Sequence, residues 1–158
     1  AGGTGLAPLF PLIPFVNQKG KHAFVFYGAR TRELLMDTQR LKTEGCKIFL
    51  ATEDGTKGSK GYITDVLKDF VLASEPRRGT DDALAIACGP TPMLRKVKEL
   101  FAQTDIPLYI SLEERMACGY GVCRGCAVKA SDPTQGYFHV CKDGPVFLAD
   151  DIDLEGEA

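Results

Sequence analysis

The sequence predicts an α/β fold in which a parallel sheet with helices on both faces precedes a smaller region of different construction. Short apolar runs alternate with longer amphipathic runs up to about residue 110, which is typical of βαβ units. After that point the alternation stops, and three cysteines fall within nine positions, at 118–126. We therefore expect two domains, residues 1–110 and residues 111–158.

The first domain contains the expected strands and helices in alternation. The strands are short apolar runs bounded by turn residues, at 22–29, 47–54, 83–90 and 107–116. The helices carry apolar residues at helical spacing or open on a proline, at 8–20, 31–45, 62–74 and 91–105. The glycine turn at 2–5 is of the kind that follows a strand, so we expect that a first strand of the sheet has been removed from this chain.

The second domain is expected to be built from hairpin strands. The runs 126–131 and 137–149 have strand-like composition and are joined by the turn-forming residues 132–136. The acidic segment 150–158 is expected to be a frayed tail.

Composition excludes several classes of function. Apolar residues make up 44% of the chain and charged residues 25%, as in soluble globular proteins. The net charge of −2 gives no support to a nucleic-acid partner. The apolar run at 6–16 is interrupted by prolines and is too short for a membrane span. It also lacks the basic leader of a signal peptide, so we expect a cytoplasmic protein without disulfides.

The cysteines of the second domain have the spacing of an iron–sulfur site. Cys118, Cys123 and Cys126 form a C-x4-C-x2-C pattern, and Cys141 follows. This is the plant-type [2Fe–2S] ligand pattern, in which a remote fourth cysteine completes the set. A loop that wraps a cluster needs unusual backbone angles, and we expect the glycines of this run to supply them. Those glycines are Gly119, Gly121 and Gly125.

Other interpretations of the cysteines remain open at this point. A structural zinc site also takes four cysteines, usually as two C-x2-C pairs, and only one such pair is present here. Unligated thiols are a further alternative. Cys46 begins a buried strand and is expected to be a small core residue.

The glycine turn at residues 2–5 suggests a nucleotide site. It departs from the dinucleotide fingerprint because Pro8 stands in place of the third glycine, so a purely structural turn is the alternative. The turn opens an expected helix, where backbone N–H groups can bind a pyrophosphate. The run 87–93 lies at the carboxyl end of another strand that is expected to belong to the same sheet, and ligands of open α/β sheets bind at that edge.

Together, the motifs of the chain resemble a known family. They occur in the order GGTGLAP (2–8), YGAR (27–30), ATEDGTKGSKG (51–61), CGPTPM (88–93), SLEERMACGYGVCRGC (111–126) and YFHVCKDGPVF (137–147). The first four resemble the NAD(P)-binding domain of the ferredoxin-reductase superfamily. The whole series resembles the electron-transfer subunits of NAD-linked dihydroorotate dehydrogenases.

This resemblance implies a nucleotide site in the first domain. By the resemblance, Gly3, Thr4 and Gly5 would cradle the pyrophosphate of NAD, and Gly28 and Arg30 would border the nucleotide. A solvated helix start is the alternative for Arg30.

The resemblance also implies contacts to the two ends of the nucleotide. Glu53 and Asp54 would face the adenosine ribose, which favours NAD over NADP. Cys88, Gly89 and Pro90 would lie beside the nicotinamide. The ligands of the cluster would be Cys118, Cys123, Cys126 and Cys141.

The function implied by the resemblance is electron transfer in pyrimidine biosynthesis. In that family the cluster carries electrons between the flavin of a dihydroorotate dehydrogenase catalytic subunit and an FAD that exchanges hydride with NAD. The family places its FAD-binding barrel before the glycine turn, so we expect this chain alone to be inactive with NADH, and to form a hetero-oligomer with the catalytic subunit. The alternatives are a related subunit of a hydrogenase, sulfide dehydrogenase or transhydrogenase complex, and a zinc-binding interaction module.

Overall fold

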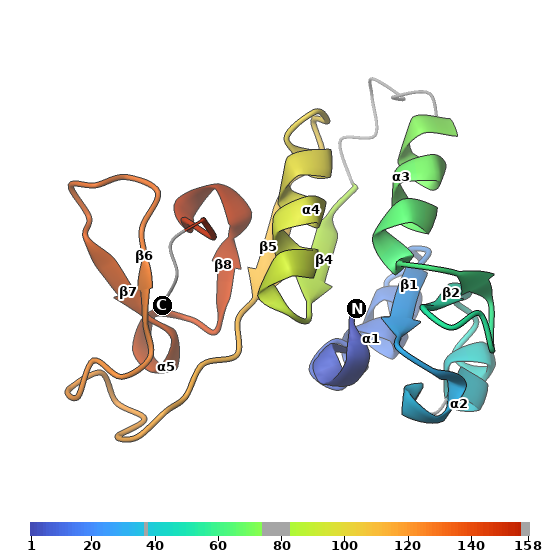
Figure 1. Cartoon of the computed structure of the whole chain (residues 1–158), viewed down its shortest axis with the longest axis horizontal. Helices are drawn as coiled ribbons and strands as arrows, with labels where there is room; N and C mark the ends of the chain where they lie inside the picture. Colours follow the sequence, from blue (N-terminus) through green and yellow to red (C-terminus); the bar gives the residue numbers. More distant parts are fainter. Residues whose placement is uncertain (37, 74–82, 156–158) are drawn as a thin grey trace. The chain divides into compact units, whose positions relative to one another are not determined.

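The computed structural model describes residues 1–36, 38–73 and 83–155 (Figure 1). The chain divides into two compact units, Ala1–Arg78 and Gly79–Ala158, and each is described by itself. The two domains expected from the sequence, residues 1–110 and 111–158, have a different boundary, because they rest on motifs and not on compactness. That division stays a prediction.

The first unit is built on a three-stranded parallel sheet. Its strands are β1 (Phe24–Ala29), β2 (Lys47–Thr52) and the short β3 (Ser59–Lys60), in the order β1-β2-β3. In the register of β1 and β2, Phe26 lies opposite Phe49 and Gly28 opposite Ala51. The predicted parallel arrangement is confirmed for β1 and β2. The expectation that the strands at 83–90 and 107–116 belong to the same sheet is wrong, because they pair with each other in a separate sheet.

Helices cover both faces of this sheet, as its apolar strands require. On one face, helix α3 (Ile63–Ala73) packs on β1 and β2, and the ring of Phe70 contacts the stacked pair Phe26 and Phe49 at centroid distances of 5.1 and 5.4 Å. On the other face, Tyr27 of β1 is fully buried with Leu6, Ile13 and Leu41. Two of these, Ile13 and Leu41, belong to helices α1 (Leu12–Gln18) and α2 (Thr38–Thr43).

Two of the expected helices are shorter than predicted. The expected helix 8–20 is helix α1, preceded by a 3₁₀ turn at Gly3–Leu6, because prolines restrict the backbone of the intervening segment. The expected helix 31–45 is also wrong over its first half, where a 3₁₀ turn at Arg32–Leu34 is followed by extended backbone at Leu35. Leu35 packs against the buried core there, and the Met36 N–H donates to the Tyr27 hydroxyl at 2.8 Å.

The start of the chain runs beside β1. Gly2 forms a parallel bridge with Gly28, and the Gly28 N–H donates to the Ala1 carbonyl at 3.1 Å. This pairing places the glycine turn next to the carboxyl end of β1.

The second unit has a mixed three-stranded sheet. Strands β4 (Ala85–Cys88) and β5 (Leu108–Ser111) are parallel, and β8 (Val146–Leu148) pairs antiparallel with β5. Helix α4 (Thr91–Phe101) packs on β4 and β5 and buries Leu94 and Val97. Figure 1 shows helix α4 lying along strands β4 and β5.

A hairpin precedes β8. Strands β6 (Ala127–Lys129) and β7 (Tyr137–His139) pair antiparallel, which confirms the predicted hairpin. The single strand expected over 137–149 is wrong, because helix α5 (Val140–Asp143) interrupts it and β8 joins a different sheet. The Asp143 carboxylate accepts from the His139 N–H at 2.7 Å and closes this helical turn.

The described part of the acidic segment 150–158 is packed, so the expectation of a frayed tail is wrong for residues 150–155. Ile152 is fully buried and forms a bridge with Ala130. Two cations of α4 reach its carbonyls: Lys98 Nζ donates to Ile152 O at 2.7 Å, and Arg95 Nε donates to Leu154 O at 2.5 Å. Ile152 and Leu154 are buried, so this segment packs against the protein although most of its other residues are acidic.

The described helices include none that is long and apolar enough to cross a membrane.

Candidate functional site: a cysteine loop and a sheet edge

The cysteine loop connects β5 to β6 without regular secondary structure. Gly119 and Gly121 have φ angles of +74° and +87°, which confirms the unusual backbone angles predicted for them. A Cβ at Gly121 would also lie 2.9 Å from Cδ of Lys142, so the loop passes close to α5 there. Gly125 was expected to share this role and does not; Arg124 takes the left-handed angle instead, at φ +60°.

Backbone N–H groups in the loop point at sulfur atoms. The Cys123 N–H donates to Cys118 Sγ at 3.5 Å, and the Gly125 N–H donates to Cys123 Sγ at 3.4 Å. N–H groups of Cys123 and Tyr120 lower the pKa of the Cys118 thiol to about 6, because they stabilise its thiolate. Thiolate is the form that binds a metal. The backbone of the loop therefore favours negatively charged sulfur at Cys118.

The hairpin brings the remaining two cysteines together. Ala127 lies opposite His139 in the β6–β7 register, and the Val140 N–H donates to the Cys126 carbonyl at 3.0 Å. This register sets Cys141 beside Cys126. A hydrogen bond to Cys126, followed by burial, raises the pKa of Cys141. The charge of Cys118 also contributes to raising this pKa, so the region around Cys141 senses both of these cysteines.

The four cysteines carry the donor chemistry of a two-iron cluster. In a [2Fe–2S] cluster each iron takes two of the four protein ligands. Across residues 1–36, 38–73 and 83–155, no group of three or more His, Cys, Asp or Glu side chains lies close enough together to hold a metal ion. All six cysteines are free thiols, so no disulfide competes for the sulfurs. The donor chemistry suits the cluster, and the assignment of these four ligands stays a prediction.

The cysteines of the loop differ in exposure. Cys126 is buried, with 2% of its surface exposed, whereas Cys123 is exposed. One side of the loop therefore faces solvent and the other faces the protein.

Cys46 lies outside the cysteine loop. Its Sγ donates to the Leu41 carbonyl at 3.1 Å, and the side chain packs against the core of the first unit. This agrees with its predicted role as a core residue.

The first unit brings several predicted nucleotide residues to one edge of the sheet. Gly3, with φ +53°, begins the turn beside the end of β1, and a Cβ there would meet no atom within 4 Å. Arg30 follows β1 directly and is exposed, as are Glu53 and Asp54 after β2. The surface above the turn is open, and these positions fit a dinucleotide lying across the edge. Their nucleotide contacts stay predictions.

The close approach of Ile63 explains why position 28 is a glycine. A Cβ at this position would lie 2.8 Å from Cβ and 2.9 Å from Cγ2 of Ile63. The missing side chain lets the start of α3 approach β1.

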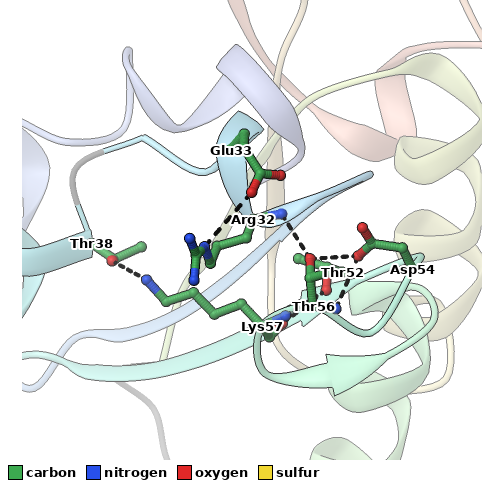
Figure 2. A network of polar contacts seen from close by, with 7 residues as sticks. All are labelled: Arg32, Glu33, Thr38, Thr52, Asp54, Thr56 and Lys57. Carbon is green, nitrogen blue, oxygen red and sulfur yellow. Dashed lines mark hydrogen bonds and ion pairs between the residues drawn. The ribbon is translucent and has the colours of Figure 1, made fainter.

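A polar network after β2 was missed by sequence reasoning (Figure 2). Thr52 Oγ1 accepts from the Lys57 N–H at 3.0 Å and donates to the Lys57 carbonyl at 3.0 Å. Lys57 Nζ donates to Thr38 Oγ1 at 2.9 Å, which ties the loop to α2. Thr56 bridges Asp54 and the backbone of Arg32. The threonines and glycines of the run 51–61 were the available signal for such a loop.

The predicted nicotinamide residues belong to the second unit. Cys88 ends β4 and is fully buried, with its Sγ 3.9 Å from Glu113 Oε1. Burial raises the pKa of the Cys88 thiol, so it stays protonated at neutral pH. Gly89 and Pro90 lead into α4, for which Pro90 is the N-cap. Their position beside a nicotinamide stays a prediction.

Comparison with known families accounts for both regions. Residues 1–99, well over half of the chain, match the oxidoreductase NAD-binding domain. The chain belongs to this NAD-binding oxidoreductase family. Residues 113–153 match the iron-sulfur cluster binding domain of dihydroorotate dehydrogenase B. The two matches confirm the predicted fold class and the resemblance, and they identify the cofactors expected of such domains as NAD and an iron–sulfur cluster.

Curated relatives are similar over nearly the whole chain. A homolog of the dihydroorotate dehydrogenase B (NAD(+)) electron transfer subunit from Aquifex aeolicus is 43% identical over 154 residues, which cover 97% of this chain and 56% of the relative. The electron transfer subunit from Listeria monocytogenes (EGD-e) is 37% identical, with 97% of this chain and 56% of the relative covered. The chain thus spans about half the length of the curated relatives it matches.

A solved structure shares the fold. It is that of an NADH-dependent reduced ferredoxin-NADP oxidoreductase, described in connection with flavin-based electron bifurcation. It is 28% identical, with a TM-score of 0.78, and the match covers 98% of this chain and 52% of that one.

Proposed function

We propose that this chain is the NAD-binding and cluster-binding part of an electron-transfer subunit of the dihydroorotate dehydrogenase B type. In this role it carries electrons between a flavin-containing catalytic subunit and the FAD and NAD of the full-length subunit, in pyrimidine biosynthesis. The observation that carries the proposal is the cysteine loop, in which backbone N–H groups point at the sulfurs of Cys118 and Cys123 and which lies in the region that matches the family's cluster domain.

The residues of the loop have distinct tasks in this function. Cys118 and Cys123 would hold one iron, and Cys126 and Cys141 the other. A bound [2Fe–2S] cluster supplies one-electron transfer, which NAD alone does not perform. The N–H groups that point at Cys118 and Cys123 would stabilise negative charge on sulfur in any oxidation state.

The exposed side of the loop supports a protein partner. Tyr120 and Val122 lie between the cysteines and are 67% and 70% exposed, and Met116 just before them is 50% exposed. Apolar side chains gathered on a surface are typical of a protein interface. A catalytic subunit that docked there would bring its own cofactor close to the cluster, and the assembly would be a hetero-oligomer.

A metal and sulfide analysis tests the cluster. Protein purified without oxygen should be red-brown and hold about two irons and two acid-labile sulfides per chain. Replacing any of the four ligands by serine, for example Cys118→Ser or Cys141→Ser, should remove most of the iron. Cys46→Ser is the matched control and should keep it. Colourless protein with one tightly bound zinc would overturn the proposal.

The second candidate function is that of the ferredoxin-NADP oxidoreductase subunit, favoured by the structural match over 98% of the chain. Full-length subunit should distinguish the two. With a dihydroorotate dehydrogenase catalytic subunit present, dihydroorotate should reduce the cluster, seen as bleaching of its visible absorbance. Bleaching by reduced ferredoxin and not by dihydroorotate would favour the second candidate.

A further inference from the structure

The hairpin β6–β7 has two faces with different surroundings. On one face, the ring of Phe138 packs against an aromatic ring of β8, with the centroids 5.7 Å apart. Successive side chains of a strand point to opposite faces, and residues paired across an antiparallel ladder share a face. In this ladder Ala127 lies opposite His139, and Lys129 lies opposite Tyr137. These four side chains therefore share the second face, away from the Phe138 contact.

A cavity of about 410 Å³ lies on this second face. It is lined by Ala127, Tyr137 and His139 of the hairpin and by Arg124, which precedes β6. Ala127 contributes only a methyl group, and the Tyr137 side chain is 64% exposed, so its ring is open to a flat molecule. The volume is within the range of sites for small molecules.

Arg124 has an unusual backbone for a residue with a side chain. Its φ angle is +60°, a conformation that glycine adopts without strain and that other residues rarely adopt. The side chain is exposed and forms no hydrogen bond or ion pair with any residue that the structure describes. A guanidinium without a partner at the wall of a cavity is suited to bind a carboxylate through two parallel hydrogen bonds.

The ring nitrogens of His139 are in different situations. Nδ1 lies 3.5 Å from Oδ2 of Asp143, which also accepts from the His139 backbone N–H at 2.7 Å. The carboxylate favours the proton on Nδ1, which leaves Nε2 as a hydrogen-bond acceptor. Nε2 is buried and has no partner among the described residues. A buried acceptor without a partner costs free energy, and a donor on a ligand would satisfy it.

From these groups we propose that the cavity is a binding site for a small aromatic or heterocyclic carboxylate that carries an N–H or O–H donor. Arg124 binds the carboxylate, the Tyr137 ring packs on the flat face of the ligand, and the ligand donates to Nε2 of His139. These lining residues are outside the sets assigned to NAD and to the cluster. Because Arg124 lies between Cys123 and Cys126 in the sequence, a bound ligand contacts the cysteine loop directly.

Calorimetry on the cluster-loaded protein tests the chemistry of the ligand. Meta- and para-hydroxybenzoate carry the ring, the charge and the donor, and the better of them should bind once per chain at millimolar concentration. Benzoate lacks the donor and should bind roughly tenfold more weakly, because Nε2 then stays without a partner. The amide of the better acid lacks the charge and should lose a similar factor. Equal binding of all these compounds, or binding of none, would overturn the proposal.

Variants at Arg124 separate a binding role from a structural one. Arg124→Gly removes the guanidinium and suits the positive φ angle, so it should weaken binding of the better acid roughly tenfold or more while the thermal unfolding midpoint stays equal or rises. Arg115→Gln is the matched control, because Arg115 is an exposed arginine of the same loop that does not line the cavity. It should bind the acid like the wild type. Wild-type affinity in Arg124→Gly would overturn the proposal.

A variant at His139 tests the hydrogen bond to the ligand. In His139→Phe the better hydroxybenzoate and benzoate should bind equally, because the acceptor is gone. The comparison of the two acids on the wild-type protein tests the same contact should this variant fail to fold. Iron and sulfide content, measured on every variant, reports on the cluster alone. Protein that keeps its cluster and binds none of the acids would overturn this inference and leave the proposed function standing.

Discussion

At the residue scale, the cysteine loop shows how backbone geometry stabilises the charged form of a side chain. Cys118 accepts the Cys123 N–H, and the positive φ angles of Gly119 and Gly121 curl the loop so that its amides face inward. The same curl is achieved at Arg124, a residue whose side chain disfavours that conformation. Backbone amides thus favour ionisation of the Cys118 thiol, an effect that a metal ion would also have.

We expect the Cys118 thiol of metal-free protein to react with iodoacetamide faster than the other thiols near neutral pH. Its pKa of about 6 lies below the ordinary value of 9.0, so the thiolate is favoured in the folded loop. The stability that this thiolate contributes is fully present above pH 9 and is lost as pH falls through 6. Alkylation, followed by peptide mass spectrometry, should rise with a midpoint near pH 6. A midpoint above pH 8 at Cys118 would contradict the amide contacts.

At the scale of elements, close packing decides which residues are tolerated. Strand β1 and helix α3 approach each other at Gly28, and the last residues described pack against α4 and β6 rather than trailing into solvent. Both contacts join segments far apart in sequence. At each contact we expect one substitution to lower the stability of the fold, because it disturbs the packing.

Gly28→Ala should destabilise the protein by about 1–3 kcal/mol, because the added methyl group overlaps Ile63 in a packed contact. The measurement is the midpoint of urea unfolding. Iron content should not change, since Gly28 is remote in sequence from the cysteine loop and belongs to the other compact unit. An unchanged midpoint would mean that α3 shifts freely to make room.

Ile152→Ala should destabilise the second unit by about 2–4 kcal/mol, because the side chain is fully buried. Asp150→Ala is the control two residues away; Asp150 is exposed, and its replacement should change stability by less than about 0.5 kcal/mol. Thermal unfolding of both variants provides the comparison. Equal stability of the two variants would mean that Ile152 is not packed and that the segment is frayed, as its composition suggests.

At the scale of the whole molecule, the chain combines a nucleotide-binding sheet with a one-electron site. The family matches assign residues 1–99 to the first and residues 113–153 to the second. Hydride exchange with NAD requires an acceptor of two electrons close to the nicotinamide, and a [2Fe–2S] cluster is not one. Hydride exchange with NAD and one-electron transfer by the cluster can therefore be measured separately.

The 158-residue chain assayed alone should not oxidise NADH, whereas its chemically reduced cluster should pass electrons to a dye. Hydride transfer needs reacting atoms within about 3–3.5 Å of each other, which a flavin bound by the full-length subunit would provide. Full-length subunit with FAD should gain NADH-dependent dye reduction in the same assay. Substantial NADH oxidation by the flavin-free chain would refute this division of labour.

Local sequence patterns predicted four of the strands, helices α3 and α4, and an iron–sulfur site. Apolar runs predicted β1, β2, β4 and β5 because a strand buried on both faces needs such a run. The cysteine spacing indicated the cluster because ligand chemistry depends on residue type and short-range spacing.

Only the tertiary structure decided the features that depend on contacts between distant segments. The β6–β7 register brings Cys141 to Cys126, and no local pattern encodes which thiols meet. The burial of Ile152 reverses the prediction from an acidic composition, since the partners that cover it lie on distant elements. Long-range packing and hydrogen bonding therefore determined these roles.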